Sequence, residues 1–249
     1  MAVIWIAAGR FAAAYDADAQ AYITAVETAD GQVLETGVRD AINAFVVGCK
    51  ADGIWNAIKA SCIMAGARTL NGALTPLAGT APTNFNFAAG DYNRKTGLKG
   101  DGSLKYLDTN RNNNADPQDS QHMAVHATTI GSSLALSGLT DVTATGISHI
   151  GSLNVRSRNS APLGVAMQTG FNGITRNNSA VYQQRVAGST ATITQASQTP
   201  ANQSLALLKT GAFYGTHRLS FYSIGESLDL ALLDARVTTL VNALAVAIP

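Results

Sequence analysis

Charged residues are scarce in this sequence, and the scarcity limits the functions that it can have. Asp, Glu, Lys and Arg make up 13% of the 249 residues, about half of the usual share in soluble domains. The 17 basic and 16 acidic residues leave a net charge of +1, so we expect no general attraction to nucleic acid or to anionic lipid. Asn, Thr, Ser, Gln and Gly must therefore form the polar surface, as is common on extracellular and virion β-proteins.

Carboxylates are almost missing between Gln121 and Gly225, where Asp141 is the only one. A glycosidase needs two carboxylates that face each other across the sugar, so we expect no enzymatic activity. The alternative is a site built from acids in turn-like segments, namely Asp91, Asp101, Asp108, Asp116 and Asp119. The same stretch carries six scattered basic residues, which we interpret as part of a solvated face: Arg156, Arg158, Arg176, Arg185, Lys209 and Arg218.

Nucleophile and cofactor motifs are missing as well. There is no P-loop, no GxGxxG, and no G-x-S-x-G between a strand and a helix. The histidines have no evident acid partner, and we expect all four to be structural or on the surface: His122, His126, His149 and His217. Two of them, His122 and His126, are four residues apart, but on a strand this separates them by about 13 Å, too far for a shared metal.

The chain has only two cysteines, Cys49 and Cys62. They form no C-x-x-C pair and no metal-ligand spacing with histidine, which excludes a zinc site. Both fall on apolar faces of predicted helices, so we expect two buried thiols. A disulfide between neighbouring helices remains the alternative.

No apolar run reaches the roughly 18 residues that span a bilayer, so we expect no membrane insertion. The apolar start, residues 1–15, has no basic segment before it, and Arg10 interrupts it. We therefore do not interpret it as a signal peptide. A protein made in the cytoplasm without a secretion signal is expected.

Residues 1–75 are predicted to form an N-terminal helical region. Asp16 or Asp18 can cap a helix that runs to about Ala29. A second helix is predicted over about 34–50, where apolar residues recur every three or four positions. A third is predicted from Ile54, Ile58 and Cys62, with a glycine at position 66 as its stop.

Residues 76–249 have the pattern of a mainly β domain. Short segments rich in β-branched and aromatic residues alternate with Gly, Asn, Ser and Pro, which favours a sandwich or jelly roll over a parallel sheet. We expect strands within 122–129, 144–155, 162–170, 180–188, 191–197 and 217–225. An amphipathic helix, about 227–247 with Ser227 as N-cap, closes the domain through one apolar seam: Leu230, Leu233, Val237, Leu240, Val241, Leu244 and Ile248.

The segment DTNRNNNADPQDS, residues 108–120, partly fits a calcium loop. Oxygen-bearing side chains stand at suitable positions: Asp108, Asn110, Asn112 and Asp119. However, Asn113 replaces the expected glycine, Pro117 stiffens the end, and the flanks are strand-like. We therefore favour a long polar turn at the edge of a sandwich, with an irregular calcium site as the alternative. No other cofactor is expected, and the pattern identifies no further ligand-binding residues.

Two segments resemble a known type of domain. LKGDGSLKYLDTNRNNNADPQDSQHMAVHATT resembles the opening of laminin G-like, concanavalin A-type jelly rolls, and HRLSFYSIGESLDLALLDARVTTLVNAL resembles their close. The segments DADAQAYITAVETADGQ, INAFVVGCKADGIWNAIKAS and GARTLNGALTPL are similar to tail-fibre-like and other structural proteins of bacteriophages, cyanophages among them. This resemblance covers about residues 11–130 and 217–247. It implies a concanavalin A-like jelly roll and glycan binding, in some members with calcium at the sandwich edge, where only the 108–119 loop could match.

Together these observations predict a non-enzymatic structural protein of a phage virion that presents a lectin-like jelly roll. A tail fibre or receptor-binding component that contacts a host surface glycan is favoured. The alternatives are a capsid decoration protein of the same fold, consistent with the lack of a fibrous shaft, and a polysaccharide depolymerase. Other virion proteins are the expected partners.

We further expect a homotrimer. The apolar start, Val3, Ile4, Trp5 and Ile6, and the stripe of the last helix could form its interfaces. The alternative is that both complete the core of the monomer.

Overall fold

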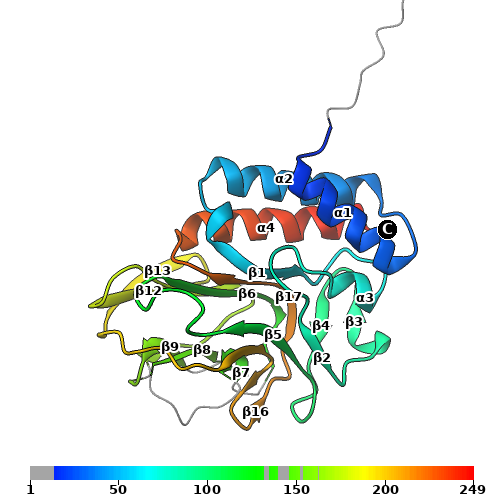
Figure 1. The fold of residues 1–249 in the computed structure, drawn as a ribbon. Coiled ribbons are helices and arrows are strands. Elements are labelled where there is room, and N and C mark those ends of the chain that lie inside the picture. Colours follow the sequence, from blue (N-terminus) through cyan, green and yellow to red (C-terminus); the bar gives the residue numbers. More distant parts are fainter. Residues whose placement is uncertain (1–13, 132–134, 140–145, 152–153, 162) are drawn as a thin grey trace, which may run out of the picture.

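A computed structural model describes residues 14–131, 135–139, 146–151, 154–161 and 163–249 of the chain. These residues form three layers: a layer of helices, a large antiparallel sheet beneath it, and a smaller antiparallel sheet beneath that (Figure 1). The predicted fold class is confirmed, because the chain is a mainly β sandwich of the jelly-roll type with helices near the N-terminus and one at the C-terminus.

The first two predicted helices are confirmed. Helix α1 (Ala17–Asp30) begins after Asp16, whose Oδ1 accepts a hydrogen bond from the Asp18 backbone N–H at 3.0 Å, and ends at Gly31, whose φ of 64° is left-handed. Helix α2 (Thr36–Ala51) buries its apolar stripe against the large sheet and α4 (Leu230–Ala247). The remaining helical segments are short: η1 (Trp55–Ala57), α3 (Leu70–Ala73) and η2 (Ala89–Asp91).

The third predicted helix is wrong, because its residues form strand β1 (Ile58–Ile63), which pairs with β17 (Arg218–Gly225). Ile58 and Ile63 contact the helices, whereas Ala60 and Cys62 contact the opposite sheet. A strand buried on both faces has no alternation between polar and apolar residues. In this segment the apolar residues are also four positions apart, which is the spacing expected of a helix. The boundary at residue 75 stays a prediction, but β1 joins the part before it to the large sheet.

In the part of the chain that the structure describes, the small sheet has seven strands and the large sheet eight. Its order is β13 (Ser189–Thr194), β12 (Val181–Val186), β11 (Gly170–Arg176), β6 (Gln121–Thr129), β17, β4 (Gly97–Lys99) and β3 (Tyr92–Asn93), with β1 also on β17. The small sheet has seven strands in the order β10 (Leu163–Gly164), β9 (Asn154–Asn159), β8 (Ile147–Gly151), β7 (Ala135–Leu139), β14 (Ser204–Leu207), β5 (Tyr106–Asn112) and β2 (Thr83–Phe85). A separate hairpin joins β15 (Lys209–Thr210) to β16 (Phe213–Tyr214).

The large sheet lies between two cores. In β6, Met123 and Val125 contact the small sheet, and Ala124 between them contacts the helices. The cysteines are divided in the same way, with Cys49 in the helical core and Cys62 in the core between the sheets. Both thiols are free and buried, as expected, and burial raises the pKa of each to about 12.

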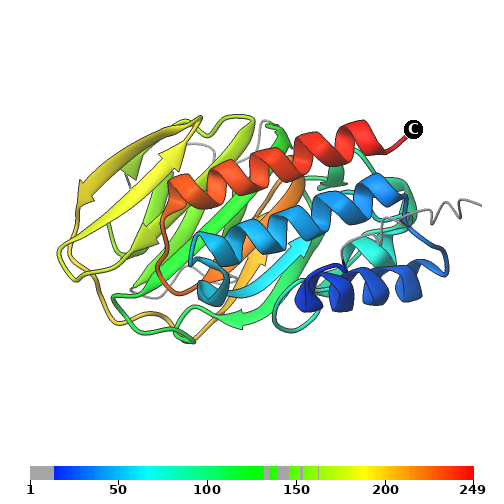
Figure 2. The same ribbon diagram turned by 90° about the horizontal axis from the view of Figure 1, so that it is seen from above.

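Helix α4 runs antiparallel to α2 across the large sheet (Figure 2). The predicted seam is buried along its whole length, although by length and hydropathy alone the helix could cross a membrane. Its predicted N-cap is wrong: Asp229 caps the helix, accepting from the backbone N–H of Ala231 at 2.7 Å and of Leu232 at 3.2 Å. Ser227 instead bonds Ser120.

Candidate functional site

The structure does not bring the four candidate calcium ligands together, because each bonds a different part of the chain. Asp108, Asn110 and Asn112 lie on β5, and Asp119 lies beyond its end. Their partners are Ser204 for Asp108, the Ala81 carbonyl for Asn110, Asn202 for Asn112 and Ser197 for Asp119. Within the described ranges, no group of three or more His, Cys, Asp or Glu side chains could hold a metal ion. The polar-turn interpretation therefore fits these residues better than a calcium site.

An arginine organises this loop. The guanidinium of Arg158 donates to four backbone carbonyls of the segment 113–120, and the residue is only 1% exposed; these carbonyls belong to Asn113, Pro117, Gln118 and Ser120. Burial lowers its pKa to about 10. Arg176, fully buried, bonds five carbonyls between residues 157 and 195 in the same way. The prediction that these basic residues belong to a solvated face is wrong for both.

Three of the histidines are built into the fold. His122 bonds the Glu226 carbonyl at 2.6 Å and Ser223 at 2.7 Å, and His126 bonds Ser220 at 2.8 Å. The Nδ1 of His217 accepts from the Gly131 backbone N–H at 2.9 Å. The Nδ1 of the fourth, His149, is buried without a hydrogen-bond partner.

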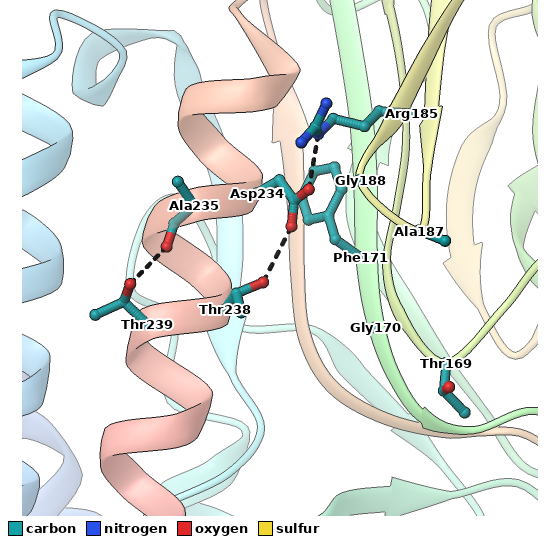
Figure 3. A pocket seen from close by; sticks show the side chains of 10 residues that line it. All are labelled: Thr169, Gly170, Phe171, Arg185, Ala187, Gly188, Asp234, Ala235, Thr238 and Thr239. Carbon is teal, nitrogen blue, oxygen red and sulfur yellow. Dashed lines mark hydrogen bonds and ion pairs between the residues drawn. The ribbon is translucent and has the colours of Figure 1, made fainter.

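A groove of about 510 Å³ lies between α4 and the β12–β13 hairpin (Figure 3), a size within the usual range for small-molecule sites. Arg185 Nε donates to Asp234 Oδ2 at 2.7 Å, and Thr238 donates to Asp234 Oδ1 at 3.0 Å. Asp234 is the only carboxylate among the residues that line the groove. Because glycoside hydrolysis needs two facing carboxylates, these lining residues do not supply that pair. The one carboxylate present is already paired with Arg185.

The other candidate site is the outer face of the small sheet, the face that points away from the large sheet. Leu107, Leu139 and Ile150 point inward into the core, so residues next to them on each strand point outward. On this face the rings of Phe85 and Tyr106, cross-strand neighbours, are parallel to within 4°, with centroids 4.3 Å apart. The Lys209 ammonium lies 4.3 Å from the Tyr106 centroid and 5.5 Å from that of Tyr214.

We call Phe85, Tyr106, Lys209 and Tyr214 the aromatic column. Tyr214 meets Tyr106 edge to face at 6.0 Å, so each member fixes the next. Because Phe85 covers one face of Tyr106, the ammonium lies over the other. Phe85 ends the column and is 37% exposed. Its free face is therefore held rigidly at the surface.

Sequence reasoning missed this column. Its members come from three separate parts of the chain and meet only because β2, β5 and the β15–β16 hairpin lie together. The chain reaches the hairpin through Leu208, which has a left-handed φ of 61°. Leucine rarely adopts this conformation, so the sequence does not predict the turn. The three aromatic residues lie far apart in the sequence, so no pattern along the chain marked them as a group.

Comparisons with known proteins give limited likenesses. No protein-family model and no curated protein matches the sequence. Among solved structures, a binding domain of botulinum neurotoxin DC in complex with SialylT gives a TM-score of 0.45 at 15% identity, covering 76% of this chain and 52% of that one. A mutant Trypanosoma rangeli sialidase with trans-sialidase activity gives 0.42 at 9%, covering 83% and 39%. Domain 4 of AbnA, a Geobacillus stearothermophilus arabinanase, in complex with arabinotriose, gives 0.36 at 13%, covering 66% and 82%. At these TM-scores no functional conclusion is transferred to this chain.

Proposed function

We propose that this chain is a non-enzymatic structural protein of a bacteriophage particle and binds a host surface glycan on the outer face of its small sheet. The aromatic column is the observation that carries the glycan-binding part. A sugar ring has an apolar face of C–H groups and a rim of hydroxyls, so it needs a flat apolar surface bordered by polar groups. Phe85 offers the flat surface, and Thr83, Asp108 and Asn110 lie beside it on β2 and β5.

The rigidity of the column favours binding. Phe85 is already fixed by stacking on Tyr106, so a ligand does not have to immobilise a freely rotating side chain. The polar groups nearby are amides, hydroxyls and a carboxylate, which match the hydroxyl groups of a carbohydrate.

The lack of paired carboxylates supports a binding role without catalysis. Among the residues that line the groove beside α4 only Asp234 is an acid, and among the polar residues named beside the column, Thr83, Asp108 and Asn110, only Asp108 is. Asp141, the lone acid of the strand-rich stretch, lies outside the described residues. Cleavage of a host polysaccharide by the purified protein would contradict this part of the proposal and would favour a depolymerase.

The virion part of the proposal rests on the charge-poor polar composition and on the resemblance of residues 11–130 to phage structural proteins. A tail position suits receptor binding, and a capsid position suits a decoration protein. Gold-labelled antibody on intact particles would separate the two. If no particle carries the protein, the virion proposal fails.

We propose a homotrimer, and of its two candidate interfaces the seam of α4 is no longer available. The seam of α4 is buried within the chain, and only Leu232 (38%) and Val246 (87%) remain exposed as large apolar residues on that helix. The other candidate, residues 3–6, lies outside the described residues. Light scattering on the full chain and on a variant lacking residues 2–6 tests it: we expect three subunits for the first and fewer for the second. A monomeric full-length protein would contradict the prediction.

A single substitution tests the glycan site. Phe85→Ala should lower binding to the best ligand on an array of bacterial surface glycans at least tenfold, because the apolar platform is removed. Tyr15→Ala is the matched control, since Tyr15 is an aromatic residue of the helical layer, bonded to Asp40. Thermal melting should show both variants folded. The proposal fails if the wild-type protein binds no glycan, or if Phe85→Ala binds as well as wild type.

A further inference from the structure

Strand β13 is a long, open edge of the large sheet. It pairs with β12 along all six of its residues, and within the described ranges no other segment pairs with it. Five of the six residues are exposed. The other sheet edges are short or covered: β3, β10 and β2 have two or three residues each, and the free side of β1 is covered at Ser61, which bridges Ala78.

The sequence of β13 does not protect this edge. Proteins normally protect a free edge with a lysine, a proline, a bulge or a covering segment. The β13 sequence, STATIT, has no charge and no proline, and its register with β12 has no shift. Its threonines and its isoleucine are β-branched, which favours further strand pairing. The edge is therefore suited to bind another extended strand.

The hairpin register shows which groups would bind such a strand. In an antiparallel pair, every second residue points its N–H and C=O away from the neighbouring strand. Counted from the two-residue turn at 187–188, these residues in β13 are Thr190, Thr192 and Thr194. Their side chains lie on the helical side of the sheet, where Arg185 donates to Thr190 Oγ1 at 2.9 Å. Ile193 points the other way, into the core between the sheets.

We propose that β13 pairs antiparallel with β13 of a second copy, about a two-fold axis at Thr192. This register puts Thr192 opposite the same residue of the second copy and Thr190 opposite Thr194, so outward-pointing backbone groups meet each other. Threonine pairs line one face of the contact, and pairs of Ala191 with Ile193 line the other. Because the strand has no charge, no like charges meet, and the edge is complementary to itself.

This contact goes beyond the proposed function and does not involve the aromatic column. Figure 1 shows β13 and β2 on opposite sides of the molecule, so pairing at β13 leaves Phe85 free. Two six-residue strands form a contact smaller than the roughly 1,000 Å² of a stable interface. The contact is therefore weak between free molecules and forms where copies are held close together. A trimer built through residues 3–6 would carry three such edges, by which neighbouring trimers join.

Disulfide trapping tests the register directly. Thr192→Cys puts two thiols at the two-fold axis with Cα atoms about 5.5 Å apart, within reach of a disulfide. Thr190→Cys is the matched control, because its two copies would lie about 14 Å apart. Mild oxidation at the same high protein concentration should link at least about five times more dimer in Thr192→Cys than in the control. The native thiols do not interfere, because Cys49 and Cys62 are buried.

The result separates this contact from chance collisions. Linking that is equal in the two variants, or missing from both, would overturn the proposed pairing. Preferential linking of Thr190→Cys would show a different register and would overturn it as well.

A charge on the edge gives an independent test. Thr192→Lys would bring two ammonium groups together at the axis, whereas Thr192→Val keeps an uncharged, β-branched residue. In sedimentation, the mass of the wild type and of Thr192→Val should rise with concentration above its value in dilute solution, and that of Thr192→Lys should not. A dilute mass of one subunit would contradict the proposed trimer alone. A wild-type mass that does not rise, or a rise that persists in Thr192→Lys, would overturn the β13 pairing alone.

Discussion

Arg158 does for its loop what a metal ion does in a calcium loop. Four backbone carbonyl oxygens of the loop point at one positive group, and that group is part of the chain. The amides and acids that suggested calcium instead bond neighbouring strands and turns. A guanidinium inside the protein needs several acceptors because leaving it unpaired is costly.

We predict that Arg158→Met lowers the free energy of unfolding by about 3 kcal/mol or more, because several buried carbonyls lose their donor. Urea denaturation measures the change. Arg39→Met is the control, since the Arg39 side chain is 29% exposed and its pairing with Glu27 is a surface ion pair, worth about 0–1 kcal/mol. Calcium should not rescue the variant; a calcium-dependent gain in its stability would show that the loop is a cation site after all.

At the residue scale, the sequence predicted what depends on neighbours along the chain. The cap at Asp16 and the left-handed glycine at position 31 were both found. Arg158 and Phe85 were not, because the partners of Arg158 lie in the distant 113–120 loop and the partner of Phe85 lies on another strand. Register there depends on irregular positions such as Asn110, whose φ is 56° where β5 and β14 shift against each other.

At the scale of elements, the start of α4 tests how far sequence rules reach. Both Ser227 and Asp229 are good capping residues, and in the structure Asp229 is the N-cap. We predict that Asp229→Ala destabilises the protein by about 1 kcal/mol, because two helical N–H groups lose their acceptor. Ser227→Ala should cost less, since its backbone N–H, which donates to Ser120, is kept. Chemical denaturation compares the two; the reverse order would favour the original assignment.

The strands were predicted unevenly, for a physical reason. Those with one polar face, such as β12, alternate visibly. Strands β1 and β11 are buried on nearly every residue because helices cover one face of the large sheet and the small sheet covers the other. Such strands lose the two-residue period. The helical layer thus explains both the mistaken third helix and the missed strand over 170–176.

For the whole molecule, the buried histidines predict a loss of stability in mild acid. Burial lowers the pKa of His122 and of His149 from 6.5 to about 4 and lowers that of His126 as well. The unfolded chain binds protons on these rings below about pH 6.5, whereas the folded chain resists them until about pH 4. Their contribution is therefore complete above pH 6.5 and is lost as pH falls towards 4.

Each of the two strongly shifted histidines contributes at most about 3 kcal/mol to this effect. We expect the urea midpoint to fall steadily from pH 7 to 4.5 and to change little from pH 7 to 8.5. His149→Gln should flatten the slope, because glutamine does not titrate. A midpoint that stays constant down to pH 4.5 would be inconsistent with neutral, buried rings.

The pairing of β1 with β17 has a consequence for synthesis. Cys62 and Tyr222, neighbours across this pair, are 160 residues apart in sequence. A growing chain cannot complete the large sheet until β17 has left the ribosome, because both β1 and β6 pair with that strand. Contacts of such long range slow folding. Until then β6 has no β17 beside it, so shielding of the unfinished sheet by a chaperone would matter most between the synthesis of β6 and that of β17.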